Sequence, residues 1–412
     1  MGTIVVPFDL EEGHTLPQFG FLKFLRARGH RICCLGMPEI EGLVRKQGFE
    51  FIPLAAPRGD QHGARIWMGS DICLGPLLRG VMDDAMSRLR PDVVMIRSQY
   101  YTEGLVIHYR YRCPIVFIIT SFRKNTRERA CENIVTNALM NFREGVPELL
   151  NLLSRSGVQF KNFKDVARDA LRFPELVLFP EAFDLPGRES EPGVYYLGAG
   201  VDLARNEEAF QWDAIDPNLP LVYSALGSQG HLNAEARGKF FRKVIDAASS
   251  RPEWQFLVAI GKGYTPQDFM PAPANVTLSN WVPQLQALAR STVMINHGGF
   301  GTIKECVLMG VPMVVLPLFN ARDHVMCAER VVYHGLGVSG DIDRVSVNDL
   351  DSLIEKVVRD RSFKGRVDLM REKFKQNRLD VGAAVIESVI AESSIDRAGP
   401  SAGPLPLTGR NG

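Results

Sequence analysis

A glycine turn in the second half of the chain has the residue types that bind phosphate. It lies between an apolar run, Val293–Ile295, and a segment of helical periodicity that begins at Ile303, and it reads Asn296-His297-Gly298-Gly299-Phe300-Gly301-Thr302. This pattern predicts a strand, a tight turn and the start of a helix. The first turn of a helix leaves N–H groups without helical partners, and glycines let a ligand approach that backbone closely. A phosphate-binding turn is therefore predicted. The alternative is that the glycines are needed only for the geometry of the turn.

Polar and aromatic residues suited to a nucleotide flank this turn. Upstream, Trp281-Val282-Pro283-Gln284 follows a predicted strand, Val276–Ser279, so that the indole can stack on a base. Downstream, Glu305 lies one turn into the predicted helix, within reach of ribose hydroxyls. A second strand, Val311–Leu316, is followed by the polar pair Asp323-His324. A base, a ribose and a sugar could thus each meet a side chain of suitable chemistry.

The order and spacing of these residues resemble the nucleotide-sugar signature of the UDP-dependent glycosyltransferases, an inverting family with two facing Rossmann-like domains known as the GT-B fold. The shared pattern is W-x-P-Q, then H-G-G, an acid in the following helix, G-V-P, and an acidic residue followed by a polar one. The resemblance implies donor-binding roles along the second half of the chain. They fall to Ser228 in a Gly-Ser turn facing the phosphates, Trp281 on the base, Gln284 and Glu305 on the ribose, His297 and Thr302 on the diphosphate, Asp323 on the sugar, and Val282, Gly298, Gly299, Gly301 and His324 beside them.

Two departures from the family pattern concern the sugar. The loop between Pro317 and Asp323 is two residues longer than the usual form, and His324 stands where the family commonly has glutamine. An imidazole is bulkier than an amide and adapts its reach less well. We therefore expect donor choice to be shifted away from plain UDP-glucose toward another hexose or a deoxysugar, with UDP-glucose as the default.

A histidine near the start of the chain is the candidate for proton transfer. His14 falls in the loop after a predicted strand, Thr3–Pro7, where parallel sheets carry ligand groups. A lone loop histidine is more often surface decoration than a catalyst. Here the segment reads Gly-His-x-x-Pro and is followed by a leucine-rich helix that ends at Arg28-Gly29-His30, which resembles the N-terminal signature of the same family. The resemblance implies that His14 is the catalytic base, and a free imidazole, with a pKa near 6.5, can accept a proton from a hydroxyl at neutral pH.

The residue that should orient this base departs from the family pattern. The family commonly has an aspartate at the end of the strand that corresponds to Pro91–Ile96, but this chain has Arg97-Ser98 there. Neither side chain accepts a hydrogen bond from an imidazolium as a carboxylate does. Two possibilities stay open at this point: another acid such as Glu103 orients His14, or His14 works unassisted.

Alternating strands and helices position all of these residues. The first half has short apolar strands separated by amphipathic helices, and the second half repeats that alternation from Leu221 to Val358. Such alternation predicts parallel, doubly wound sheets with right-handed crossovers. We therefore predict an α/β protein with two facing Rossmann-like domains and a cleft between them, the GT-B fold. The strands expected in the first half are Thr3–Pro7, Arg31–Leu35, Phe49–Leu54, Pro91–Ile96, Cys113–Thr120, Leu176–Pro180 and Val194–Leu197.

The predicted boundaries follow shifts in composition. We expect an N-terminal acceptor-binding domain over 1–203, a charged linker over 204–220 and a nucleotide-sugar-binding domain over 221–365. A helix over 366–393 should cross back to the first domain, and the tail 396–412 is too poor in apolar bulk to order itself. Residues 121–174 read as helical, and in the resembled family this part lines the acceptor site.

Composition excludes several classes of protein. The 412 residues are 45% hydrophobic, which suits two ordinary cores, and 48 basic residues balance 47 acidic ones, which argues against a nucleic-acid binder. Seven cysteines without a C-x-x-C pair indicate free buried thiols, with Cys33 and Cys34 on opposite faces of a strand. No apolar run reaches the roughly 18 residues that span a bilayer, and the opening segment does not resemble a secretion signal. We expect a cytoplasmic protein that is a monomer or a homodimer.

The sequence as a whole predicts an inverting glycosyltransferase. It would move a hexose from a nucleotide-activated sugar, most simply a UDP-sugar, to a hydroxyl of a lipophilic small-molecule acceptor. The nucleotide sugar is a co-substrate, and we expect no other cofactor and no obligatory metal, since no Asp-x-Asp motif lies near the donor loops. Two alternatives stay open: a nucleotide-sugar-binding or auxiliary protein without turnover, or a nucleotide-sugar epimerase or hydrolase.

Overall fold

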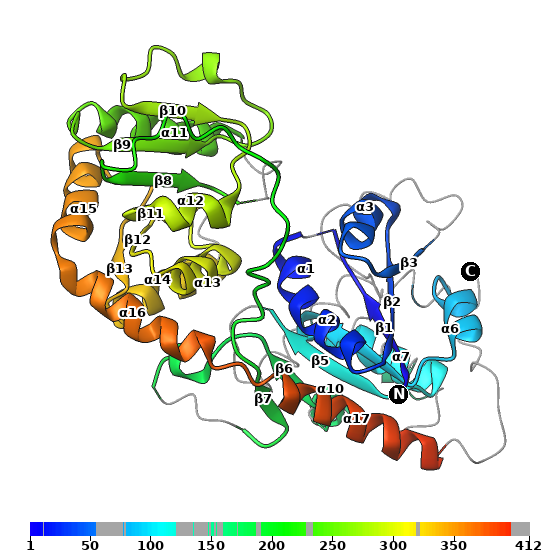
Figure 1. The fold of residues 1–412 in the computed structure, drawn as a ribbon. Helices are drawn as coiled ribbons and strands as arrows, with labels where there is room; N and C mark the ends of the chain where they lie inside the picture. The colour runs from blue at the N-terminus through cyan, green and yellow to red at the C-terminus, as the bar shows by residue number, and fades with distance from the viewer. Residues whose placement is uncertain are drawn as a thin grey trace. The chain divides into compact units, whose positions relative to one another are not determined.

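The chain consists of two α/β units (Figure 1). The computed structural model describes residues 1–10, 12–54, 77, 80–120, 135, 147, 150–151, 154, 160–170, 172–186, 191–227, 234–318 and 322–396. The first unit holds Met1–Leu178, Arg188–Gly200 and Arg378–Gly412, and the second holds Phe179–Gly187 and Val201–Asn377. The first unit therefore includes a C-terminal segment, Arg378–Gly412, that is distant in sequence from the rest of it.

The described residues of the first unit form a seven-stranded parallel sheet with the order β3-β2-β1-β4-β5-β6-β7. The short strands are almost entirely buried, as expected for a parallel sheet with helices on both faces. The strands are β1 (Thr3–Pro7), β2 (Arg31–Gly36), β3 (Glu50–Pro53), β4 (Val93–Arg97), β5 (Ile115–Ile119), β6 (Glu175–Val177) and β7 (Val194–Tyr196).

Alternate residues of these strands enter two different cores. Val5 and Cys33 pack in one core with α6 (Asp83–Leu89) and α7 (Tyr101–Tyr111), near α10 (Phe163–Ala170). Cys34 packs on the opposite face, with helices that come from both ends of the chain. This opposite placement of the two thiols confirms the sequence prediction, and the five described cysteines are all buried thiols. The helices of the second face are α2 (Phe19–Ala27), α3 (Pro38–Lys46) and α17 (Leu379–Asp396).

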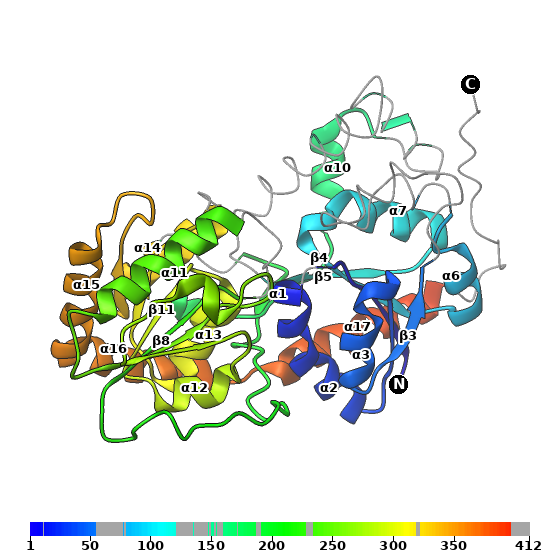
Figure 2. The same cartoon turned by 90° about the horizontal axis from the view of Figure 1, so that it is seen from above.

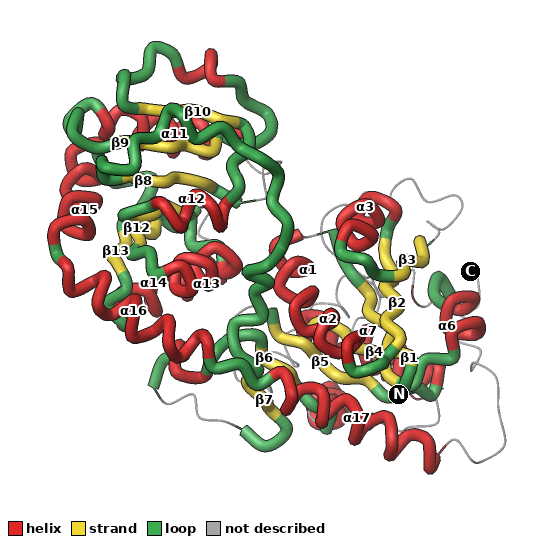
Figure 3. Tube along the Cα trace, in the orientation of Figure 1, coloured by secondary structure: helices red, strands yellow, loops and turns green. Residues whose placement is uncertain are grey.

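The described residues of the second unit form a six-stranded parallel sheet with the order β10-β9-β8-β11-β12-β13. Because all its strands are parallel, the loops that follow them lie at one edge of the sheet. Figure 3 shows the strands of each unit enclosed by helices. The strands are β8 (Leu221–Ala225), β9 (Gln255–Ala259), β10 (Val276–Ser279), β11 (Val293–Asn296), β12 (Met313–Val315) and β13 (Gly337–Ser339).

Helices cover both faces of this second sheet (Figure 2). Helices α11 (Ala234–Ala248) and α15 (Val347–Arg359) pack together on one face, over Val293 and Ile295. On the other face, α13 (Phe300–Met309) brings Cys306 within 3.3 Å of Met294. Further helices of the second unit are α12 (Gln284–Arg290), α14 (Arg322–Tyr333) and α16 (Arg361–Lys375).

Several elements differ from the sequence predictions. Helices α6 and α7 and strand β13 were not expected from the pattern, and the helix expected over 366–393 is parts of two helices separated at 376–378. Only the second of these, α17, packs in the first unit, whereas α16 packs on α13. The stretch expected as a linker, 204–220, lies within the second unit.

Two of the expected features lie mostly outside the described residues. They are the helical segment 121–174, apart from α10 and a few single positions, and the tail from 397 onward. In the described part of the chain, no helix has the length and apolar character needed to cross a membrane.

Candidate active site

The predicted glycine turn connects strand β11 to helix α13. Gly298 has a left-handed φ of 89°, and its N–H donates to Asn296 Oδ1 at 2.8 Å. A side chain at this position would be strained, and its Cβ would lie 2.7 Å from the backbone oxygen of His324. The turn therefore needs glycine both for its conformation and for the close approach of the first turn of helix α14 (Arg322–Tyr333). This confirms the predicted strand, turn and helix.

His297 is held tightly inside this turn. Its ring lies 2.7 Å from a Cβ built on Gly299 and 3.1 Å from one built on Gly227, which follows β8 with a φ of 65°. The side chain is buried, and burial, followed by the charge of His324, lowers the pKa of His297 to about 3. The imidazole is therefore neutral at physiological pH and can donate one N–H without carrying charge.

Two buried polar atoms of the turn have no hydrogen-bond partner among the described residues. They are Nδ1 of His297 and Nδ2 of Asn296. Buried polar atoms are costly to leave unsatisfied, and such atoms in native proteins call for an explanation such as a ligand. Thr302 lies buried in the first turn of the adjoining helix α13, where the backbone N–H groups have no acceptor within the helix. The start of α13 therefore combines unsatisfied polar groups with the positive end of a helix dipole.

The predicted sugar residues lie beside this turn, at the start of α14. The ring of His324 packs edge-on against the ring of His297, with centroids 4.5 Å apart. Its Nδ1 lies 3.3 Å from the carbonyl oxygen of Leu318. Asp323 is partly exposed one residue earlier. The lengthened loop before Asp323 includes 319–321, which lie outside the described residues, as does Ser228.

The two predicted ribose residues contact each other. Gln284 begins α12, and its Nε2 donates to Oε2 of Glu305 at 2.6 Å. Trp281 is 44% exposed in the loop after β10, so a face of its indole is open, whereas Val282 is buried. The sequence thus identified Gln284 and Glu305, which the fold brings together, and Trp281, whose exposed indole lies in the loop before α12.

A third residue at this position was not identified from the sequence. Arg205 donates from Nη1 to Glu305 Oε1 and from Nη2 to Oε2, the latter at 3.2 Å. Glu207 accepts from Nη2 of Arg205 at 2.9 Å, and it also accepts from the backbone N–H groups of Leu285 and Gln286 at the start of α12. The charge-rich composition of this segment predicts a linker, and no local pattern indicates that its charges face α12 and α13.

In the first unit, the candidate base has a hydroxyl partner. His14 lies in the short helix α1 (Glu12–Thr15), and its Nδ1 is 3.2 Å from Oγ1 of Thr120, the residue that follows β5. Thr120 is buried. If Nδ1 carries the proton, it donates to the threonine and leaves Nε2 as a proton acceptor. Thr120 differs from both sequence-based expectations, Glu103 or no partner, because a hydroxyl at the end of a strand is not a distinctive sequence signal.

Arg97, which replaces the family's usual acid, is part of a buried ion pair. It contacts Asp9, the residue two positions after β1, and Asp9 also accepts from the hydroxyl of Tyr100 at 2.8 Å. The guanidinium lies 5.5 Å from the centroid of the Tyr100 ring. Arg97 and Asp9 are both buried, so the pair joins the ends of β1 and β4 rather than facing solvent.

The contact between Thr120 and His14 gives a testable result. Thr120→Val keeps the shape of the side chain and removes the hydroxyl, so we expect a two- to tenfold fall in turnover, about the net value of one hydrogen bond. Loss of the partner should lower kcat and leave KM for the nucleotide sugar close to that of the parent, which a general structural defect would not do. Thr120→Ser retains a hydroxyl and should restore the parent kcat. An unchanged kcat in Thr120→Val would show that this contact does not position the base.

Comparison with known proteins relates this arrangement to one family. The sequence model of the family described as UDP-glucoronosyl and UDP-glucosyl transferase matches residues 221–378. The NDP-glycosyltransferase YjiC of Bacillus subtilis is 24% identical, over 93% of this chain and 96% of that protein. The demethyllactenocin mycarosyltransferase of Streptomyces fradiae is also 24% identical, over 93% of this chain and 85% of its own length.

The solved structures show the same fold. The kitacinnamycin glycotransferase is 24% identical, covers 94% of this chain and 99% of its own, and superposes with a TM-score of 0.76. The two parallel sheets described above match that structure over nearly its full length. Residues 221–378 therefore match the UDP-glycosyltransferase family, and the chain is similar to glycosyltransferases over nearly its whole length and has the GT-B fold.

Proposed function

We propose that this protein transfers a hexose from a nucleoside-diphosphate sugar, with a UDP-sugar as the first donor to test, to a hydroxyl of a lipophilic small molecule. The observation that best supports the donor site is the buried, neutral imidazole of His297 between two glycines at the start of α13. The relative from Streptomyces fradiae is named a demethyllactenocin mycarosyltransferase, which supports a natural product as the acceptor.

The proposed reaction proceeds with inversion at the anomeric carbon. Nε2 of His14 accepts the proton of the acceptor hydroxyl as the oxygen attacks that carbon. The bond from the anomeric carbon to the diphosphate oxygen breaks, and the nucleoside diphosphate leaves with the electron pair. His297, Thr302 and the N–H groups at the start of α13 stabilise the charge that develops on it.

The remaining donor contacts follow from the chemistry of each side chain. The exposed indole of Trp281 stacks on the base, and Gln284 and Glu305 bind the ribose. Asp323 and His324 meet the sugar hydroxyls. Because the diphosphate is stabilised by these groups, the scheme requires no cofactor and no obligatory metal. Addition of EDTA should accordingly leave turnover unchanged.

Release of nucleoside diphosphate from a labelled UDP-sugar tests this proposal. The measurement is made with and without a panel of hydroxylated acceptors, and products are identified by mass spectrometry. Release that depends on an acceptor supports transfer. Release without an acceptor would indicate a hydrolase, and binding without release would indicate a binding protein. NMR of the anomeric configuration in the product then distinguishes inversion from retention.

Trp281→Ala provides an independent test of where the nucleotide binds. We expect the affinity for UDP to fall by about 1–3 kcal/mol, the usual value for a lost base stack, because the indole is exposed and its removal should not disturb the core. Isothermal titration calorimetry with free UDP gives the change directly. Trp212→Ala is a suitable control, since that indole lies under the guanidinium of Arg290, 4.2 Å away, and should not affect UDP affinity. Equal affinities for the parent and Trp281→Ala would place the base elsewhere.

A further inference from the structure

A buried ion pair lies at the carboxyl ends of two neighbouring strands of the first sheet. Arg97 is the last residue of β4, Asp9 follows β1 by two residues, and their paired side chains are 4% and 0% exposed. Asp9 also accepts from the hydroxyl of Tyr100 at 2.8 Å, and Nη2 of Arg97 donates to Oε1 of Gln99. A buried ion pair adds little stability compared with apolar side chains of the same volume, so stability alone does not explain this one.

Asp9 lies in the connection between strand β1 and the helix that carries His14. The sheet holds the chain as far as Phe8, whose N–H donates to the carbonyl oxygen of Leu35 at 2.7 Å. Helix α1 begins at Glu12, and Asp9 belongs to neither a strand nor a helix. The carboxylate of Asp9 therefore ties this connection to the end of β4.

The order of the strands places Arg97 between the proposed base and its partner. The order is β1-β4-β5, with α1 following β1 and Thr120 following β5. Nδ1 of His14 nevertheless lies 3.2 Å from Oγ1 of Thr120. The base therefore reaches across the end of β4, the strand that Arg97 terminates. A connection that is fixed to this end through Asp9 sets where the ring of His14 can lie.

We propose that the ion pair of Arg97 with Asp9 is a positioning element for the base: it fixes the connection from β1 to α1 so that His14 meets Thr120 and the acceptor hydroxyl. Arg97 is a positioning residue that acts through Asp9 and takes no part in the proton transfer. This inference rests on the proposed function, because it requires His14 to accept the proton. The competing explanation is that the two charges only neutralise each other, so that their joint removal is harmless.

Removal of one member of the pair is the first test. Arg97→Met leaves the carboxylate of Asp9 buried without the charge of Arg97, so we expect Tm to fall by about 5–15 °C. A misplaced base loses rate, and kcat should fall by about 10–100-fold. KM for the nucleotide sugar and the affinity for UDP should stay close to the parent values, because the residues proposed to bind the donor all belong to the second unit.

Removal of both charges separates the two explanations. In the double variant Arg97→Met with Asp9→Asn, the pair holds no charge, and the asparagine can still accept from Tyr100. We expect Tm to return close to that of the parent, whereas kcat should stay about 10–100-fold lower because the ionic tie is lost. Recovery of kcat together with Tm would overturn the proposal, since the two charges would then have served only each other.

A variant that keeps both charges tests the geometry directly. Asp9→Glu can still pair with Arg97, but its longer side chain changes the distance between the connection and the end of β4. We expect kcat to fall by about tenfold, with KM for the nucleotide sugar unchanged. A parent value of kcat in Asp9→Glu would show that charge alone matters at this position, and the proposal would fail.

A second pair in the first unit has the same composition and serves as the matched control. Arg110 donates from Nε and Nη2 to Asp83 at 3.0 and 2.7 Å, and Asp83 accepts from the hydroxyl of Tyr111 at 2.7 Å. Helix α7 runs from the carboxyl end of β4 to the amino end of β5, and Arg110 lies in its last turn, at the end opposite to Arg97. Asp83 is 38% exposed, so Arg110→Met should lower Tm less than Arg97→Met does, and it should leave kcat unchanged.

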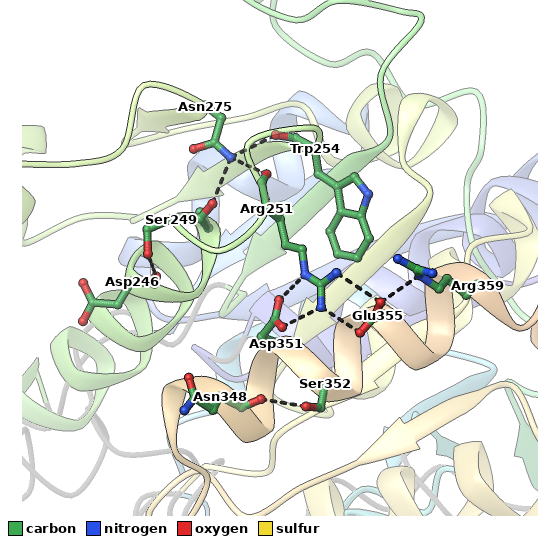
Figure 4. Close-up of polar contacts among 11 residues, drawn as sticks. Asp246, Ser249, Arg251, Trp254, Asn275, Asn348, Asp351, Ser352, Glu355 and Arg359 are labelled. Carbon is green, nitrogen blue, oxygen red and sulfur yellow. Dashed lines mark hydrogen bonds and ion pairs between the residues drawn. The ribbon is translucent and has the colours of Figure 1, made fainter.

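A network in the second unit controls for loss of stability by itself. Arg251 forms bidentate bonds with two carboxylates, Asp351 and Glu355 of α15 (Figure 4). It precedes strand β9, at the edge of the sheet opposite to the loops of the candidate site. Arg251→Met should lower Tm and leave both kcat and the affinity for UDP unchanged. A fall in kcat similar to that of Arg97→Met would assign both losses to reduced stability and would overturn the proposal.

His14→Ala, measured beside these variants, separates this inference from the proposed function. If His14→Ala is slow and the double variant of the pair has the parent kcat, the inference fails alone. If His14→Ala retains the parent rate, His14 is not the base, and the inference fails together with that part of the proposed function. A slow double variant with the Tm and KM of the parent supports the inference.

Discussion

Replacing His14 by alanine should lower the rate of glycosyl transfer by about 10²–10⁴-fold, the usual contribution of a general base. The base acts on the acceptor hydroxyl, and His14 belongs to the first unit, whereas the residues proposed to bind the donor belong to the second. The affinity for the nucleoside diphosphate should therefore remain close to that of the parent. Steady-state kinetics and calorimetry on the same preparations measure the two effects separately.

A histidine outside the carboxyl edge of the first sheet serves as the control for His14. His30 is buried just before β2 and its Nε2 lies 3.3 Å from Glu387 of α17, where it has no role in the proposed reaction. His30→Gln should keep the parent rate. Activity of His14→Ala within a few-fold of the parent would remove His14 from the mechanism, whether or not the donor binds normally.

Replacing His297 by glutamine should reduce turnover by about 10²–10³-fold, the typical loss when one donor to a developing negative charge is removed. Glutamine keeps an N–H donor but cannot reproduce the rigid ring wedged between Gly227 and Gly299. Affinity for free UDP should fall less than turnover, because the diphosphate gains charge as the bond to the sugar breaks. Equal losses in turnover and in affinity for UDP would mean that His297 binds the nucleotide without assisting the departure of the nucleoside diphosphate from the sugar.

The same substitution predicts a change in acid stability. Burial lowers the pKa of His297 to about 3, below its ordinary value near 6.5, so the folded protein resists protonation of this ring and the unfolded chain does not. The contribution of His297 to stability is therefore complete above about pH 6.5 and is lost as pH falls toward 3. Urea unfolding at pH 7 and pH 5 should show a larger acid-induced loss for the parent than for His297→Gln.

A control for His297 is available in the same unit. His334 follows α14, and its Nε2 lies 3.1 Å from the carbonyl oxygen of Phe183, with the ring stacked on that phenylalanine. His334→Gln should leave transfer unaffected, because that ring is not adjacent to the turn after β11. A fall in turnover similar to that of His297→Gln would point to a general loss of folded protein instead of a catalytic effect.

Much of the architecture was predictable because its signals are local. The apolar strands are short and buried on both faces, which makes them visible as runs such as Val93–Ile96, and β1 and β10 have the predicted bounds. The turn from His297 to Gly301 was visible because a left-handed glycine and the start of a helix have their own residue preferences. Helices α6 and α7 were missed because their apolar positions are less regularly spaced.

The fold alone decided which distant side chains complete each candidate site. Thr120 is 106 residues from His14, and Arg205 is 100 residues from Glu305, so neither pair leaves a pattern in any local window of the sequence. In the sequence, Arg97 stands where the family commonly has an acid. Only the pairing of β1 with β4 shows that Arg97 forms an ion pair with Asp9. The sequence by itself determined the resemblance to a family of glycosyltransferases, the alternation of strands and helices, and the chemistry available at each turn. The parallel sheets determined which side chains contact each other in the candidate sites, because they bring the ends of strands that are far apart in the chain to one edge.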